Sequence, residues 1–220
     1  LVPVYLKTKY AGKACFKNTK TIITIHNLAY QGHFWHLDMN LTGLDWSLFN
    51  WKQLEFYGKL SFLKGGIVFS DLITTVSKTY AEEIQTPEYG EGLDGVLKER
   101  ANDLYGIING IDYTIWNPES DKFIIANYGM KNLNGKHLCK KALQRKYKLP
   151  ERGVPLVGMI TRLADQKGLD LVVDKFRDLM KADLQFILLG TGEQRYHEFF
   201  QDYARAYPAK VAVKLSFDER

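Results

Sequence analysis

Apolar residues along this chain follow two alternating patterns. Short runs rich in β-branched residues recur at intervals, and longer segments with apolar residues at three- and four-residue spacing lie between them. This alternation predicts an α/β fold in which crossover helices join parallel strands. The expected strands are TIITI at 21–25, DLITTV at 71–76, LYGII at 104–108, PLVGMIT at 155–161, LQFILL at 184–189 and VAVKLSF at 211–217.

Two of these strands and two helices are predicted in more detail. TIITI and LQFILL are almost continuously apolar, so we expect both strands to be covered on both faces. The segment from Gly168 to Met180 has one apolar stripe and predicts a helix. A second helix is predicted from Leu54 to Ile67, although Gly65 and Gly66 weaken its last turn.

Loop signals are concentrated between Ile111 and Pro155, where several Asn, Gly and Pro residues interrupt the apolar periodicity. We therefore predict two domains, 1–117 and 118–220, each with its own parallel sheet.

Composition and charge narrow the possible classes of protein. The 220 residues carry a net charge of +5 and are 45% hydrophobic, enough for a buried core. The most basic stretch, 136–148, has helical apolar spacing and favours a solvated helix face over a nucleic-acid patch. Cys15 and Cys139 form no CxxC pair, so no disulfide framework or thiolate metal site is indicated. Without a membrane-length apolar run or a signal-peptide pattern, we expect a cytoplasmic protein with no membrane partner.

Arg162 and Lys167 stand in the loop TRLADQKG, between a predicted strand and a predicted helix. In a parallel sheet, ligands bind at the carboxyl ends of the strands, where the next helix also offers free backbone N–H groups. A guanidinium and an ammonium at this edge indicate a phosphate-bearing ligand. The equally weighted alternative is a solvated loop whose cations pair with Asp165 or Asp170.

The next strand is followed by LLGTGEQ, with Gly190 and Gly192 on either side of Thr191. A single GxG is a weak signal, because glycines also serve ordinary tight turns. Both loops, however, follow successive parallel strands and should meet at one sheet edge. That position predicts a joint ligand site.

His26 and Asn109 follow predicted strands of the first domain. A histidine at a strand end can donate to a sugar hydroxyl or move a proton, but a plain loop-capping role is the more frequent explanation. Asn109 belongs to an Asn-Gly pair, which is first a turn signal and second a possible ligand contact at a domain junction.

Two further patterns in the first domain are interpreted as structural. His33 and His36 have a spacing that could hold a metal on a helix, but with no third ligand nearby we interpret them as loop or surface residues. The run Lys64-Gly65-Gly66 lacks the P-loop spacing, and we interpret it as helix packing.

Five segments together resemble one known family. TIHNLAYQG, FLKGGIVFSDLITTVSKTY, GIINGIDYTIWNP, TRLADQKGLDL and LLGTGE occur here in the order seen in bacterial glycogen synthases and plant starch synthases. The resemblance covers nearly the whole chain. It implies a GT-B fold, with 1–117 belonging to the N-terminal acceptor-side domain and 118–220 to the C-terminal donor domain.

The resemblance also implies a reaction and residue roles. The resemblance implies a retaining glycosyltransferase that moves glucose from ADP-glucose to the non-reducing end of an α-1,4-glucan. Such an enzyme would need no metal or other cofactor. Arg162 and Lys167 would then hold the donor diphosphate, and His26 would contact the transferred glucose. The expected substrate-binding residues are Asn109, Gln166, Gly190, Thr191 and Gly192. If the source is a plant, the expected location is the plastid.

Two motifs implied by the resemblance are missing from this chain. A Lys-x-Gly-Gly donor loop would precede Leu1, and a segment with paired glutamates would follow Arg220. We therefore expect this piece to be inactive by itself. The alternatives are a UDP-glucose-dependent GT-B transferase and a glucan- or nucleotide-binding module without catalysis.

Overall fold

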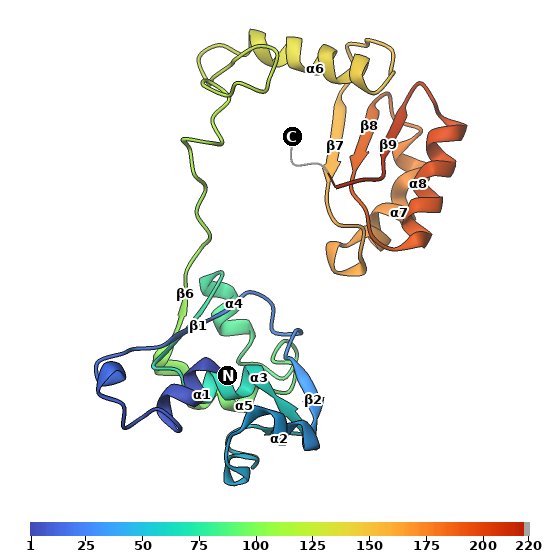
Figure 1. Ribbon diagram of the computed structural model, residues 1–220. Coiled ribbons are helices and arrows are strands. Elements are labelled where there is room, and N and C mark those ends of the chain that lie inside the picture. The colour runs from blue at the N-terminus through green and yellow to red at the C-terminus, as the bar shows by residue number, and fades with distance from the viewer. Residues whose placement is uncertain (218–220) are drawn as a thin grey trace. The chain divides into compact units, whose positions relative to one another are not determined.

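The computed structural model describes residues 1–217, in which the chain divides into two structural units (Figure 1). The first unit spans Leu1–Ile111 and the second begins at Asp112. The predicted boundary after Asn117 therefore lies slightly inside the second unit. In residues 1–217, no helix has both the length and the apolar character needed to cross a bilayer.

A parallel sheet of order β1-β5-β6 forms the centre of the first unit. Its strands are β1 (Ile22–Ile25), β5 (Leu72–Thr75) and β6 (Leu104–Gly106). The expectation that both faces of TIITI are covered is wrong, because β1 lies at the sheet edge and Ile22 is 62% exposed. Alternate residues of a strand point to opposite faces, so only the face carrying Ile25 joins the core.

Short helices pack with the strands of this unit in two apolar clusters. One cluster gathers around Ile67 and Ile73, and the other around Val4 and Leu60. The helices of the unit are α1 (Val2–Lys7), η1 (Ala14–Phe16), η2 (His36–Asp38), α2 (Met39–Thr42), η3 (Trp46–Leu48), α3 (Phe62–Phe69), α4 (Lys78–Glu83), α5 (Asp94–Glu99) and η4 (Ala101–Asp103).

The helix predicted from Leu54 to Ile67 is wrong in its first half. Residues 55–61 form a hairpin of β3 (Glu55–Phe56) and β4 (Lys59–Ser61), and β2 (His33–Trp35) pairs with β4 on its other side. The two turn residues, Tyr57 and Gly58, have positive φ angles of 48° and 78°. This conformation matches the twist of a two-residue hairpin and interrupts any helix.

The helical half begins after Ser61, whose side chain caps α3 by accepting from the Lys64 N–H. The helix continues through both glycines to Phe69. A Cβ on Gly65 would lie 2.4 Å from Cδ2 of Leu54, and one on Gly66 would lie 2.3 Å from Cδ1 of Ile23. The packing interpretation of these glycines is confirmed, because a Cβ at either position would require the Leu54 or Ile23 side chain to move.

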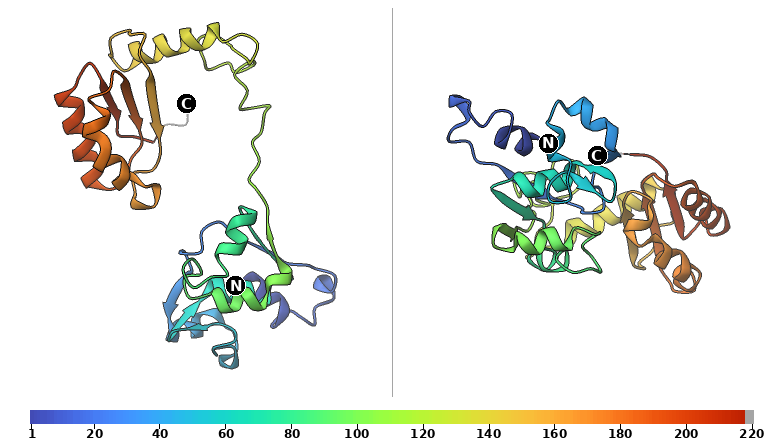
Figure 2. Two further views of the ribbon diagram at one scale, coloured as in Figure 1. Left: turned by 180° about the vertical axis from the view of Figure 1, so that it is seen from behind. Right: turned by 90° about the horizontal axis from the view of Figure 1, so that it is seen from below.

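The second unit contains a parallel sheet of order β7-β8-β9. Helices α7 and α8 cover one face of it (Figure 1 and Figure 2), and their core centres on Phe176 and Phe200. Leu149, Ile187 and Ala212 form a smaller cluster. The bounds are α6 (Asn134–Lys146), β7 (Leu156–Ile160), η5 (Asp165–Lys167), α7 (Leu169–Leu179), β8 (Gln185–Leu189), α8 (Gln194–Ala206) and β9 (Val211–Lys214).

Two predictions for this unit are confirmed. The expected helix at 168–180 is α7, which follows the left-handed Gly168 at φ 65°. Strand β8 lies at the centre of the sheet and is buried over most of its length, as its continuous apolar run predicts.

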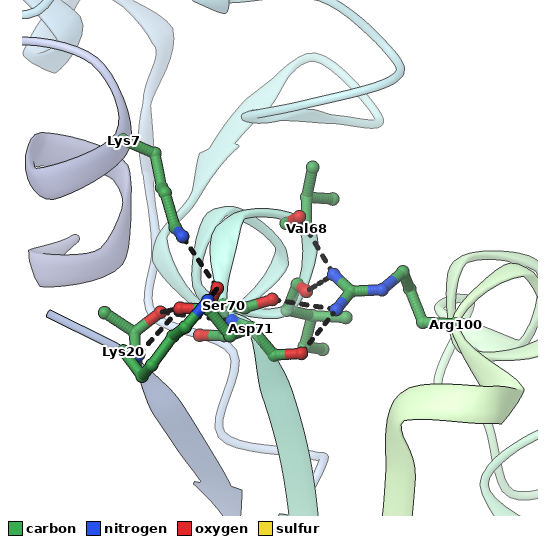
Figure 3. Close-up of polar contacts among 8 residues, drawn as sticks. Lys7, Lys20, Val68, Ser70, Asp71 and Arg100 are labelled. Carbon is green, nitrogen blue, oxygen red and sulfur yellow. Dashed lines mark hydrogen bonds and ion pairs between the residues drawn. The ribbon is translucent and has the colours of Figure 1, made fainter. Parts of the chain in front are cut away.

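Polar side chains hold the segment between α3 and β5 in the first unit (Figure 3). Arg100 donates to the carbonyls of Val68 at 2.9 Å and Ser70 at 2.7 Å, and so satisfies the carboxyl end of α3. Asp71 accepts from Lys7 Nζ at 2.8 Å and from the Thr21 N–H at 2.8 Å. These bonds join α1, the start of β1 and the start of β5.

The hydrogen bonds from Lys7 and Thr21 lower the pKa of Asp71 far below its ordinary value. The carboxylate therefore stabilises the fold above its unfolded pKa of about 4, and this contribution is lost as pH falls below that value. We predict that Asp71→Asn lowers the free energy of unfolding by about 1 to 3 kcal/mol at pH 7 and flattens its acid dependence. Urea unfolding followed by tryptophan fluorescence measures this, because three of the four tryptophans precede Asp112. Glu82→Gln, which changes an exposed carboxylate on α4, is the control; equal losses in both variants would contradict the role of Asp71.

Candidate functional site

The loops that follow β7 and β8 are joined along their backbones at the carboxyl edge of the second sheet. Thr161 donates to the carbonyl of Leu189 at 3.1 Å, Leu163 donates to that of Thr191 at 2.9 Å, and Glu193 donates to that of Leu163 at 2.8 Å. The parallel pairing thus continues past the strand ends as an isolated bridge between 163 and 192. The predicted meeting of these two loops at one edge is confirmed.

Gly190 and Gly192 make this close approach possible. A Cβ on Gly190 would lie 1.9 Å from the carbonyl oxygen of Thr161, and one on Gly192 would lie 2.1 Å from that of Leu163. Any side chain at either position would force the loops apart. The GxG pattern is therefore explained first by backbone packing, and the packing itself shapes the edge at which a ligand would bind.

A pocket of about 540 Å³ opens at this edge. Its size falls in the range typical of small-molecule sites. Arg162 is its cationic lining residue, while Ile160 and Leu189 contribute apolar walls. Such a lining suits a ligand that combines an anionic group with an apolar or aromatic part. The full lining consists of Ile160, Thr161, Arg162, Leu189, Gly190, Thr191, Gly192, Ser216 and Phe217.

The remaining predicted residues of this loop lie on η5. Nη2 of Arg162 is 3.4 Å from Oε1 of Gln166, which orients the guanidinium. Lys167 is exposed at the end of η5 and is not among the pocket-lining residues. In the described part of the chain, neither Arg162 nor Lys167 forms an ion pair with Asp165 or Asp170. The structure thus brings Arg162 together with residues 190–192 and leaves Lys167 beside them.

Asp165 has other partners, which the sequence patterns did not reveal. It forms an ion pair with Arg195 and accepts a 2.5 Å hydrogen bond from the Tyr196 hydroxyl. The Asp165 carboxylate raises the pKa of Tyr196 to about 12. These contacts tie η5 to the start of α8, and no residue spacing predicts them because 30 residues separate the partners.

His197 is a second residue that the sequence patterns did not identify. Its Nε2 accepts a hydrogen bond from the N–H of Gly192 at 3.0 Å, which requires the proton of the neutral ring to be on Nδ1. The Gly190 N–H donates to the carbonyl of Lys214 at 3.1 Å. Within residues 1–217, the N–H of Thr191 forms no such bond.

In the first unit, His26 and Asn109 lie at one edge of the sheet. His26 directly follows β1 and is exposed, whereas Asn109 comes three residues after the end of β6. Strand β5 separates β1 from β6, and the three strands are parallel, so both residues stand at the carboxyl edge. Their predicted placement is confirmed, and their roles stay predictions.

His33 and His36 show no metal-binding arrangement. His33 lies in β2, where its ring stacks on Phe56 at 5.1 Å and its Nε2 is 3.0 Å from Oε1 of Gln31. Burial and the nearby Lys59 lower the pKa of His33. Among residues 1–217, no group of three His, Cys, Asp or Glu side chains is placed to bind a metal.

Comparisons with known proteins agree with this architecture. Residues 1–99 match the sequence profile of the starch synthase catalytic domain. The chain is 53% identical to glycogen synthase of Thermosipho africanus and 51% identical to that of Thermotoga maritima, in each case over 99% of this chain. This chain belongs to the glycogen and starch synthase family. It spans 45% of the length of each of these two synthases.

A solved structure extends the similarity to three dimensions. The catalytic domain of Starch Synthase IV from Arabidopsis thaliana, bound to ADP and acarbose, matches 99% of this chain and 46% of its own length. The TM-score is 0.91 and the sequence identity 33%. The GT-B fold class expected for this synthase-family chain is thereby confirmed.

The packing of Gly190 against the Thr161 carbonyl predicts a steric cost. Gly190→Ala should lower the free energy of unfolding by about 1 to 3 kcal/mol, because the added methyl group overpacks the joined loops. Urea denaturation measures the effect. Gly158→Ala is the matched control on β7, since a Cβ there would meet nothing within 4 Å. A Gly190→Ala variant as stable as this control would contradict the packing role.

The His197 bond predicts a local change in the loop. His197→Ala should speed hydrogen exchange at the Gly192 amide by about fivefold or more, because one hydrogen bond of about 1 kcal/mol is lost. His197→Gln keeps a side-chain acceptor and should retain part of the protection. The control is His137→Ala, at an exposed position on α6. Unchanged exchange in His197→Ala would show that this bond does not hold the loop.

Proposed function

We propose that the protein containing this chain transfers glucose from ADP-glucose to the non-reducing end of an α-1,4-glucan, with retention of configuration. The observation that carries the proposal is the Arg162 pocket at a strand-end edge, in a chain about half identical to glycogen synthases along its whole length. ADP bound to the Arabidopsis relative supports an adenine nucleotide as the donor's leaving group.

The pocket suits the diphosphate half of such a donor. Arg162 can bind two phosphate oxygens at once, and the N–H and hydroxyl of Thr191 can donate to another. Lys167, exposed at the end of η5, has a long flexible side chain that can supply a second cation. Glycosidic bond cleavage leaves negative charge on the departing phosphate, and a preorganised donor at that charge contributes about 3 to 4 kcal/mol.

The apolar lining residues of the pocket have a separate role in this proposal. Ile160, Leu189 and Phe217 surround the same pocket and offer surface for the nucleoside rather than for phosphate. Gln166 would hold Arg162 in position through its contact with the guanidinium. Binding of both parts of the nucleotide would fix the anomeric carbon for attack.

His26 and Asn109 are assigned to the sugar. An imidazole at a strand end can hold a glucose hydroxyl or shift a proton, and the amide of Asn109 can both donate and accept. These two roles rest on the family resemblance and on their shared edge of the first sheet. No metal or other cofactor is part of the proposal.

Glucan elongation by the complete gene product, with ADP-glucose and UDP-glucose assayed side by side, tests the reaction. We expect ADP-glucose to be preferred. Arg162→Ala and Lys167→Ala should each lower kcat by about 100-fold, because each removes a cation from the developing charge. The matched control is Lys175→Ala, an exposed lysine on α7, which should leave kcat unchanged.

Three results would contradict parts of this proposal. A preference for UDP-glucose would assign a different donor, and glucan binding without any transfer would indicate a non-catalytic module. Unchanged turnover in Lys167→Ala would remove that lysine from the mechanism. Titration of ADP into the 220-residue chain separates binding from catalysis, because Arg162→Ala should weaken ADP binding even where transfer cannot be measured.

A further inference from the structure

Acidic side chains stand beside the Arg162 pocket of the second unit. Asp165 lies between Arg162 and Lys167 in the chain, and Glu193 directly follows the lining residue Gly192. A carboxylate repels a phosphate group, and it also pairs readily with a neighbouring cation. These acidic residues should therefore weaken an anion site unless another group holds them.

Arg195, in the first turn of α8, contacts both carboxylates. Its guanidinium forms an ion pair with Asp165, and its Nε lies 3.0 Å from Oε2 of Glu193. The other oxygen of Glu193 accepts a hydrogen bond from the N–H of Asp165 at 3.3 Å. Arg195 is not among the pocket-lining residues. It thus holds the acidic groups beside the pocket without being part of the lining.

The neighbouring Tyr196 contacts the same oxygen of Asp165. Tyr196 is 3% exposed, and its hydroxyl donates to Oδ1 of Asp165 at 2.5 Å. Because this hydrogen bond raises the pKa of Tyr196 to about 12, the hydroxyl remains a donor at neutral pH. The guanidinium carbon of Arg195 lies 4.6 Å from the centroid of the Tyr196 ring, a cation–π distance. A buried hydroxyl and a cation therefore meet at one carboxylate oxygen.

These contacts affect the two cations of the loop, Arg162 and Lys167. Within residues 1–217, neither cation forms an ion pair with Asp165, and Arg162 contacts Gln166 instead. An exposed ion pair such as that of Arg195 contributes little to the stability of a fold. The more specific consequence is electrostatic, because Arg195 occupies a carboxylate that could otherwise neutralise a cation of the anion site.

We propose that Arg195 is a positioning residue for the donor site. Together with Tyr196 it keeps Asp165 from pairing with the two cations of the loop, so that both remain available to a diphosphate. Arg195 acts through Asp165 and does not itself contact the ligand. The identity of the ligand as a nucleoside diphosphate sugar rests on the proposed function, whereas the restraint on Asp165 follows from the contacts.

Calorimetric titration of ADP and of inorganic pyrophosphate into the complete gene product tests this role. Arg195→Ala should weaken the binding of both about fivefold or more, because the freed carboxylate pairs with a loop cation. Arg195→Lys keeps the cation and should retain part of the affinity. Tyr196→Phe removes only the hydroxyl and should weaken binding by a smaller factor. The Arg195 side chain is 58% exposed, so its variants should stay folded.

A double variant separates this role from a purely structural one. Asp165→Asn combined with Arg195→Ala removes the freed carboxylate and should recover most of the lost affinity, whereas loss of a structural contact would not be repaired. Asp170→Asn combined with Arg195→Ala has the same net charge and should not recover, since Asp170 lies on α7 outside this set of contacts. Arg205→Ala is the single-variant control, because Arg205 is an exposed arginine of α8 that pairs with Asp202 at 2.6 Å.

Three results would overturn the proposal. These are an unchanged ADP affinity in Arg195→Ala, equal recovery in the Asp165 and Asp170 double variants, and no binding of ADP, UDP or pyrophosphate to the unmodified protein. UDP is titrated as a further ligand because it shares the diphosphate. If UDP binds in place of ADP with the same order of affinities among the variants, the proposed donor is wrong and the role of Arg195 stands.

Discussion

A close approach of two backbones in the second unit determines what its sheet edge can bind. Thr161 to Leu163 and Gly190 to Gly192 are in contact main chain to main chain, at distances that exclude even one methyl group. That contact fixes the floor of the pocket and the direction of the Arg162 backbone. The N–H groups of Thr161, Leu163 and Glu193 are used to make it, while those of Gly190 and Gly192 donate to Lys214 and His197.

The first unit is stabilised by a different kind of contact, in which cationic side chains donate hydrogen bonds to backbone carbonyls. Lys64 donates to the carbonyl of Glu55 in β3, Arg100 donates to carbonyls at the carboxyl end of α3, and burial lowers the pKa of Lys64. A cation in this role stabilises helix and hairpin ends but no longer attracts an anionic ligand. For this reason a basic sequence does not imply a basic binding surface, and the cations considered for phosphate binding are Arg162 and Lys167 instead.

Local patterns predicted those parts of the structure in which local chemistry and tertiary packing agree. The predictions of helix α7 and strand β8 are confirmed. An amphipathic stripe and a continuous apolar run are each compatible with one kind of element in an α/β unit. The hairpin at 55–61 was missed because the apolar spacing there also fits a helix. The deciding feature is the Tyr57-Gly58 turn, and tyrosine is a poor sequence signal for it.

The same distinction applies to the candidate site. Strand-end positions of Arg162, residues 190–192, His26 and Asn109 follow from topology, so they could be predicted. The contacts of Asp165 with Tyr196 and of His197 with Gly192 depend on how α8 packs against the loops, which no spacing encodes. Candidate site residues can therefore be found from sequence more readily than the residues that hold them in place. Tyr57 belongs to neither group, because its positive φ angle is a property of the hairpin turn that tyrosine itself does not signal.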